Sequence, residues 1–157
     1  MIREAKISDI KDIAKINIAS WQTTYAGIID REFLRDLSFK ETTERWNKHF
    51  LNNRNKIFVA EAHGKIVGYV RSERIDDKDF LGAIYLLDDY QGKGLGKQLL
   101  MQGLDYLKPS KMIYVHVLEA NKTKYFYQKY GAELYKKSKI KIGRQILSEL
   151  TFIWNFE

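Results

Sequence analysis

The chain of 157 residues contains no cysteine, which excludes disulfide bonds, cysteine nucleophiles and thiolate metal sites. Its three histidines, His49, His63 and His116, are far apart and lack metal-ligand spacing, so we expect no metal site. No apolar run approaches the roughly 20 residues of a membrane-spanning helix, and the first residues lack the apolar core of a signal peptide. A cytoplasmic protein without a membrane partner is the simplest interpretation of these absences.

Composition and charge are those of an ordinary globular protein. Apolar residues make up 45% of the chain and charged residues 30%, and Pro109 is the only proline. Neither a linker nor a repeat interrupts the sequence, so we expect residues 1–157 to form a single domain. The formal net charge is +7, and the one dense basic group lies at residues 136–141. We interpret that group as solvated surface and expect no nucleic-acid partner; the alternative is a basic site whose affinity for nucleic acid weakens steeply with salt.

Residues 84–107 carry the strongest structural signal. The apolar run at 84–87 is typical of a strand that is buried on both faces. Three glycines then fall within five residues: Gly92, Gly94 and Gly96. Such a run is unfavourable unless the backbone must bend sharply or approach a ligand closely. Residues 95–107 place apolar side chains on about half of a helical wheel at ~100° per residue, which predicts a helix lying flat on a sheet.

The start of this helix is a predicted anion site. A first helical turn leaves backbone N–H groups unpaired and carries the positive end of the helix dipole, and Lys93 and Lys97 add positive charge nearby. Phosphate is the anion that fits best. The dinucleotide pattern G-x-G-x-x-G fails because Lys97 stands where the third glycine is required, and the P-loop pattern fails at the same residue.

The pattern that does fit is Gln91-x-x-Gly94-x-Gly96, placed between an apolar strand and an amphipathic helix. It resembles the acetyl-coenzyme A signature of the GNAT superfamily of N-acetyltransferases. The glycine spacing alone is common in unrelated turns, whereas the succession of strand, pattern and helix is much more specific. The resemblance is strongest over residues 56–131 and loosest over 20–52.

The periodicity of the whole chain predicts an α/β (α+β) fold. The order of strand, helix and strand over 84–118 makes the two strands parallel neighbours. We expect a mixed, mostly antiparallel central sheet of about seven strands with helices on both faces, which is the acyl-CoA N-acyltransferase fold that the resemblance implies. The predicted strands are 2–7, 57–62, 66–71, 84–87, 112–118, 132–142 and 145–156. The predicted helices begin at residue 8 and at about 30, 40, 95 and 121.

The resemblance also implies an activity, with acetyl-CoA as co-substrate. The acetyl group would pass to a primary amine of a small molecule or peptide by direct attack through a tetrahedral intermediate, without a metal. By position, the backbone of Leu86 and Leu87 would bind the pantetheine arm, and the N–H of Leu86 would stabilise the oxyanion by ~3–4 kcal/mol. The pyrophosphate would be bound by the backbone around Gln91, Gly92, Lys93, Gly94, Leu95, Gly96 and Lys97. The alternative is that the glycines merely turn the chain onto the helix.

The departing thiolate needs a proton. Tyr127 resembles the tyrosine of the family's F-Y-x-x-x-G pattern, which implies that it donates this proton and contacts the cofactor; the alternative is a core aromatic residue. Asn121 resembles the family's cofactor-binding asparagine, but here Tyr127 follows it after six positions instead of the usual seven. One residue turns a helix by ~100°, so the two cannot both keep the usual register, and Asn121 is alternatively only a helix N-cap.

The acceptor side is the least defined part of the sequence. No general base is evident: Glu73 or Asp79 could act through water, but a carboxylate at such a position is more often a solvated surface group. Trp21 and Tyr25, in a loop expected over 21–27, would bind the acceptor or else fix the loop to the core. The acceptor's identity and a homodimer remain open, as does a non-catalytic acyl-CoA sensor of the same fold.

Overall fold

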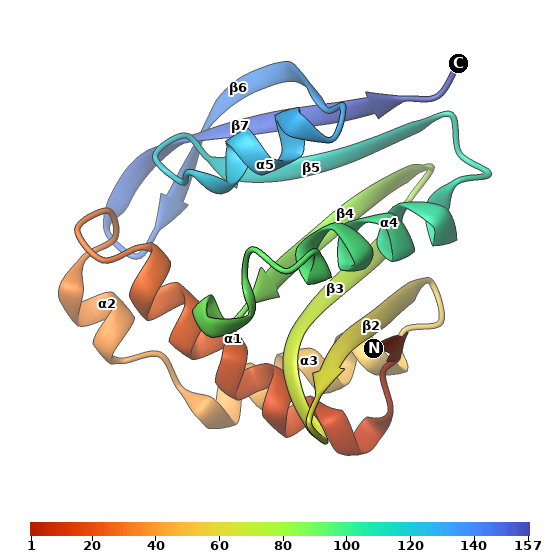
Figure 1. Cartoon of the computed structure of the whole chain (residues 1–157). Helices are drawn as coiled ribbons and strands as arrows, with labels where there is room; N and C mark the ends of the chain where they lie inside the picture. Colours follow the sequence, from red (N-terminus) through yellow and green to blue (C-terminus); the bar gives the residue numbers. More distant parts are fainter.

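A single seven-stranded sheet forms the centre of the computed structural model, which describes residues 1–157. The strand order is β1-β2-β3-β4-β5-β7-β6, and every neighbouring pair is antiparallel except β4 and β5. The fold is therefore the expected mixed, mostly antiparallel sheet (Figure 1). The strands are β1 Ile2–Glu4, β2 Asn55–Ala62, β3 Lys65–Ile75, β4 Lys78–Leu86, β5 Met112–Leu118, β6 Glu133–Ile142 and β7 Gln145–Asn155.

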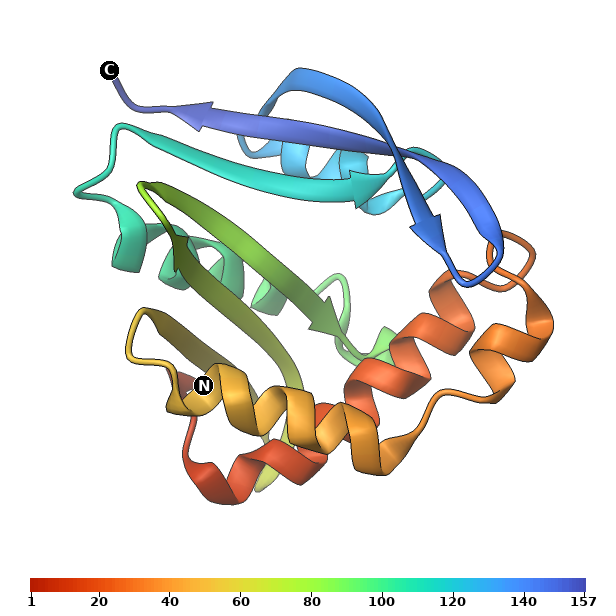
Figure 2. The same ribbon diagram turned by 180° about the vertical axis from the view of Figure 1, so that it is seen from behind.

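Helices cover both faces of this sheet. Figure 1 shows α4 (Leu95–Leu107) and α5 (Thr123–Lys129) on one face. From behind, Figure 2 shows α1 (Ile10–Thr24) and α3 (Phe39–Leu51) crossing the other face, over β2 to β4. The short helix α2 (Arg31–Arg35) lies at the edge of that layer, near the turn between β6 and β7.

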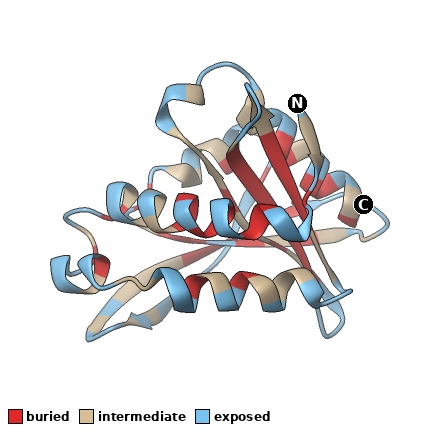
Figure 3. Cartoon of the chain, turned by 90° about the horizontal axis from the view of Figure 1, so that it is seen from below, coloured by how far each residue is buried: buried red, intermediate tan, exposed pale blue.

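Two apolar layers fill the space between the helices and the sheet. On the α4 side, Leu99, Leu100 and Leu107 are fully enclosed, and burying each side chain stabilises the fold by roughly 1.5–3 kcal/mol. On the opposite side, Trp46 of α3 and Tyr69 of β3 pack at right angles against the inner face of α1. Figure 3 shows this division, with buried residues on the helix faces that touch the sheet and exposed residues outside.

The predicted element boundaries fail at the strands before the site and in the N-terminal region. The strand predicted over 66–71 runs to Ile75, and the strand predicted over 84–87 begins at Lys78, so the expected connection at 76–79 is reduced to a tight turn. The first strand ends at Glu4 instead of residue 7, and the predicted loop over 21–27 is wrong because α1 continues to Thr24. The helix continues because its backbone hydrogen bonds persist: the N–H of Tyr25 donates to the carbonyl of Trp21. The hydroxyl of Thr23 also turns back to the Ala19 carbonyl at 3.0 Å, so threonine here accommodates the helix rather than ending it.

The feature that creates the site is the separation of β4 from β5. These parallel strands pair only from Asp79 to Leu81, opposite residues 113–115. Immediately afterwards Gly82 forms a bulge in β4, since Leu81 and Ala83 are opposite consecutive residues of β3 while Gly82 has no partner there. Beyond the bulge the two strands diverge, as Figures 1 and 2 show from both sides. Polar backbone groups on the facing edges are thus left without a strand partner.

Candidate active site

The turn between β4 and α4 has a backbone conformation that requires glycine. Gly92 has φ +77° and Gly94 has φ +86°, a left-handed region that side chains disfavour. Gly94 is also the residue that precedes the first turn of α4, so the helix begins directly from this left-handed position. Gly96 differs, because it lies inside the helix at an ordinary φ, and an added Cβ would be in normal contact with the Phe126 ring at 3.7 Å.

The start of α4 presents a row of free backbone donors. The first N–H that closes a helical hydrogen bond is that of Gln98, which donates to the Gly94 carbonyl at 3.1 Å. The N–H groups of residues 92–97 donate to no protein acceptor. No acidic residue lies in the first turn of the helix, so no carboxylate of that turn offsets its dipole, and the one acidic side chain that lines the adjoining cavity is Asp88. This is the arrangement of donors that the sequence analysis expected for an anion site.

A cavity of about 510 Å³ opens in front of these donors. Its walls come from the end of β4, the glycine turn, the last turns of α1 and one face of α5. Lys97 supplies positive charge, and so does Lys129 on α5, which the sequence analysis missed. Residues 123 and 126 of α5, and residue 130 directly after the helix, also line it, and their spacing of three and four is that of one helix face, a signal present in the sequence.

The edge of β4 adds a donor to this cavity. The N–H of Leu87 donates to the Val67 carbonyl of β3 at 2.9 Å. Because these directions alternate along an antiparallel strand, the N–H of Leu86 points away from β3, toward the side where β5 has diverged. The Leu86 carbonyl on that side accepts a hydrogen bond from the Gln91 side chain at 2.9 Å, which links the strand end to the turn.

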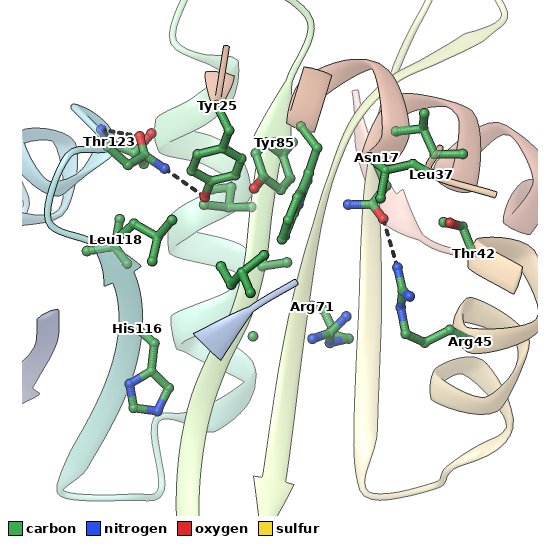
Figure 4. Close-up of a pocket in the computed structure, with 18 of the residues that line it drawn as sticks. Asn17, Tyr25, Leu37, Thr42, Arg45, Arg71, Tyr85, His116, Leu118 and Thr123 are labelled. Atoms are coloured by element: carbon green, nitrogen blue, oxygen red, sulfur yellow. Dashed lines mark hydrogen bonds between the residues drawn. The ribbon is translucent and has the colours of Figure 1, made fainter. Parts of the chain in front are cut away.

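A second cavity, of about 410 Å³, lies on the α1 and α3 side of the divergence. It meets the first cavity in the gap between the strands, since Ile84, Tyr85 and Thr123 line both. Figure 4 shows side chains entering this space from distant elements: Arg45 of α3, Arg71 of β3 and His116 of β5. The protein therefore has two adjoining chambers, one in front of the free N–H groups and one lined by aromatic and charged side chains.

Tyr127 lies at the second chamber, almost fully buried on α5. Its ring stands perpendicular to that of Trp154, with centroids 5.8 Å apart, so packing fixes its position. Burial is the main cause of a raised pKa for the Tyr127 phenol, and the nearby Tyr25 phenol is the second. The hydroxyl therefore keeps its proton at neutral and moderately alkaline pH and is available as a donor.

Tyr25 and Asn121 form a structural link across the same chamber. The Asn121 amide nitrogen donates to the Tyr25 hydroxyl at 3.1 Å, and its oxygen accepts the Thr123 N–H at 2.9 Å (Figure 4). Both polar atoms of Asn121 are thereby engaged within the protein. Trp21 packs edge-on against Tyr25 with ring centroids 4.9 Å apart and is itself half-buried.

Comparison with known proteins agrees with this architecture. Residues 17–132 match the acetyltransferase (GNAT) family, well over half of the chain. The chain belongs to this family. It is 36% identical over 161 aligned positions to an uncharacterised N-acetyltransferase, YuaI of Bacillus subtilis, covering 98% of this chain and 91% of that protein. The protein is accordingly an acyltransferase of the GNAT family.

Two further relatives extend the family assignment. A spermidine N(1)-acetyltransferase of Thermoplasma acidophilum is 26% identical, with 73% of this chain and 77% of that protein aligned. The fold matches the crystal structure of the PaiA N-acetyltransferase from the same organism in complex with coenzyme A, with a TM-score of 0.74. That match has 24% identity and covers 95% of this chain and 96% of the other. In this acetyltransferase none of the helices has the length and apolar character needed to span a membrane.

The residues predicted for the cofactor of this acetyltransferase divide between the chambers. Seven line the chamber with the glycine turn: Leu86, Leu87, Gln91, Gly92, Gly94, Gly96 and Lys97. Lys93 and Leu95 line neither chamber, and the Lys93 ammonium lies over the Tyr90 ring at 5.6 Å. Asn121 and Tyr127 line the other chamber, together with the predicted acceptor residues Trp21 and Tyr25.

Neither carboxylate suggested as a base from the sequence faces the chambers of the acetyltransferase. Asp79 lies where β4 and β5 are still paired, bonded to the Ser110 hydroxyl and 3.5 Å from Arg74, and burial raises its pKa. Glu73 is buried beneath Gly82 and accepts a hydrogen bond from Arg71 Nε at 2.5 Å.

Several ionisable residues that the sequence analysis missed as site residues do line the second chamber, and His116 and Glu149 are a pair among them. Nδ1 of His116 lies 2.8 Å from the Thr151 hydroxyl and 3.8 Å from a carboxylate oxygen of Glu149 on β7. The sequence did contain a signal for His116, since it is a histidine inside the apolar strand predicted over 112–118. Alternation along a strand places its side chain on the face opposite Val115 and Val117. Its pairing with Glu149 depends on β7 lying beside β5, which the sequence does not specify.

Proposed function

We propose that this chain transfers the acetyl group of acetyl-CoA to a primary amine of a small molecule or peptide. The observation that carries the proposal is the row of N–H groups at residues 92–97 without a protein acceptor. Four of these residues, 92, 94, 96 and 97, line a chamber that adjoins a second one at the gap between the strands. A site for an anionic carrier thus adjoins a site for a second reactant.

The first chamber fits a diphosphate. Gly92 and Gly94 adopt φ values that a bulkier residue disfavours, and an added Cβ at either position would meet no protein atom within 4 Å. The donors are therefore exposed by conformation and remain open to a ligand. Lys97 and Lys129 add charge that would complement two phosphate groups. When bound there, acetyl-CoA supplies the thioester that the reaction consumes.

The N–H of Leu86 serves in this proposal as the donor to the acetyl oxygen as that oxygen gains negative charge. It points into the strand gap and has no strand partner, so it needs no rearrangement to act. One such preorganised donor is worth ~3–4 kcal/mol of transition-state stabilisation. Gln91 supports it by holding the carbonyl of the same residue at 2.9 Å.

Tyr127 serves as the acid that protonates the departing sulfur. Its raised pKa keeps the phenol protonated, and no hydrogen bond to the protein competes for its proton. A thiol has an ordinary pKa of ~8.5, so a phenol donates to its thiolate only when the two are held in contact. Tyr127 lies on α5 and packs against Trp154, which provides that constraint.

His116, with Glu149 beside it, is the proposed acceptor of the amine's proton. It lines the second chamber and its ring is half-exposed there. The nearby carboxylate and the Thr151 hydroxyl would hold the ring in orientation. The imidazole receives the proton either directly from the amine or through one bridging water.

The test is a thiol-release assay with acetyl-CoA and a panel of amines, combined with mass spectrometry of the products. The proposal predicts an acetylated amine for at least one class of acceptor and a rise in melting temperature with coenzyme A. A protein that is stabilised by coenzyme A but acetylates no amine would contradict the catalytic part. A protein whose melting temperature does not respond to coenzyme A would contradict the cofactor site itself.

A further inference from the structure

The charges of the second chamber are arranged unequally, and this arrangement narrows the class of acceptor if the proposed function holds. Two arginines, Arg45 and Arg71, line the α3 and β3 side. The only acidic side chain that lines the chamber is Glu149, on the β7 side. Figure 4 shows the arginines and His116 entering the space from these different directions.

Arg45 has no acidic partner. Its one hydrogen bond runs from Nη2 to the side-chain oxygen of Asn17 at 3.4 Å, a neutral acceptor. Asn17 is itself fixed, because its amide nitrogen donates to the buried Tyr69 hydroxyl at 3.1 Å and its oxygen also accepts from Trp46 Nε1. The guanidinium is therefore held at the chamber while its charge is left uncompensated.

Arg71 is held with its outer nitrogens free. Its Nε donates to Glu73, and its guanidinium stacks over the Trp46 ring at 5.0 Å. Neither Nη nitrogen donates to a protein acceptor, and the residue lines the chamber. Glu73 offsets the charge of Arg71 but leaves its fork of donors available, the geometry that binds carboxylates in a bidentate manner.

His49 lines the same side of the chamber and adds no charge. Burial is the main cause that lowers the pKa of His49 to about 4, and Arg71 and Arg45 follow as lesser causes. The imidazole is therefore neutral at pH 7. The positive character of this end of the chamber therefore comes from the two arginines.

We propose that the acceptor is an amine that also carries an anionic group, of the amino-acid class, with its carboxylate bound by Arg45 and Arg71. Its amino group then lies toward Glu149 and His116, where a carboxylate favours an ammonium ion before deprotonation. A volume of about 410 Å³ suits a small molecule of this kind.

Polyamines fit this chamber poorly. A spermidine molecule whose reacting amine lay near His116 would direct its remaining ammonium groups into a chamber with two arginines and one carboxylate. Like charges in such proximity are destabilising, and no second acidic side chain lines the chamber to offset them. The acceptor class therefore differs from the one named for the spermidine acetyltransferase relative.

The test compares acceptors that differ only in the carboxylate. Thiol release is measured with a pool of the standard amino acids, with the corresponding amino-acid amides, and with spermidine. We expect kcat/KM to be at least tenfold higher for the best amino acid than for its amide. This comparison is stringent, because removing the carboxylate lowers the amine's pKa and so increases the reactive free base of the amide.

A variant pair assigns the preference to the arginine. Arg45→Gln is expected to lower kcat/KM for the best amino acid by about 10- to 100-fold, the usual effect of losing a hydrogen bond to a charged group, and to leave the amide unchanged. Lys40→Gln removes an exposed charge from the same helix outside the chamber and should change neither. Equal effects of Arg45→Gln on acid and amide, or amides or spermidine as the better acceptors, would overturn the proposal.

Calorimetric binding separates this inference from the proposed function. The coenzyme A-loaded protein is titrated with the amino-acid pool and with the amide pool, in wild type and Arg45→Gln. Binding of the acids that depends on Arg45 supports the inference even if no amine is acetylated, a result that would overturn only the catalytic proposal. Absence of binding by both pools, together with absence of turnover, would overturn both.

Discussion

Replacing Tyr127 by phenylalanine removes one hydroxyl from the wall of the second chamber and little else. The ring is buried and packs against Trp154, contacts that phenylalanine keeps. The hydroxyl makes no hydrogen bond within the protein, so the variant loses no internal partner. We expect its free energy of unfolding to stay within about 1 kcal/mol of wild type, which is ~2–4 °C in melting temperature for a chain of this size.

The same replacement should strongly reduce turnover. General acid catalysis contributes ~10²–10⁴-fold, so kcat for amine acetylation should fall by at least 100-fold, while the melting-temperature increase with coenzyme A persists. Because burial raises the pKa of Tyr127, the neutral phenol persists above its ordinary value of ~10. Wild-type kcat should therefore show no loss from Tyr127 ionisation up to about pH 10.

The assay is thiol release at saturating acetyl-CoA, with pH profiles and thermal melts. Tyr125→Phe is the matched control, because Tyr125 lies on the same helix and is 61% exposed, and it should behave as wild type. Full turnover in Tyr127→Phe would refute the acid role. An equal fall in both variants would show that the helix, and not this hydroxyl, is responsible.

Three further predictions concern other parts of the chain. Gly94→Ala places a side chain at φ +86°, so unfolding free energy should fall by ~1–2 kcal/mol and melts should show a smaller stabilisation by coenzyme A. Gly82→Ala brings a Cβ within 2.7 Å of the Glu73 carboxyl carbon and should raise acceptor KM without changing that stabilisation. Arg3, chiefly by hydrogen bonding, lowers the pKa of Asp9, so the stability it adds is present above pH ~4 and lost as pH falls through the lowered value. The free energy of unfolding measured with urea should be lower for Arg3→Met than for wild type at pH 7, and the two values should converge in acid. An equal difference at both pH values would contradict this prediction.

Local patterns in the sequence were sufficient to predict the half of the site that we propose binds an anion. The predicted helix at 95–107 and the predicted strand at 112–118 have the bounds found in the structure. Both follow from apolar periodicity and from the glycines and proline at their ends, which act over a few residues. The free N–H groups at 92–97 result from the same local geometry and need no distant part of the chain.

The acceptor side could not be predicted in the same way. Arg45, Arg71, His116 and Glu149 come from four different elements, and only the tertiary fold brings them to one chamber. Asn121 was assigned from local spacing, yet its amide bonds Tyr25, 96 positions away. The end of α1 was missed for a related reason, since packing of the last turn outweighs the weak helix preference of threonine.

The central claim is that the N–H groups at residues 92–97 bind a diphosphate. Amide NMR spectra of the labelled protein, titrated with coenzyme A and separately with pantetheine, which lacks the phosphates, test it most directly. The account predicts large shifts of the resonances of residues 92–97 with coenzyme A and much smaller ones with pantetheine. Equal responses to both ligands, or shifts confined to other parts of the chain, would contradict it.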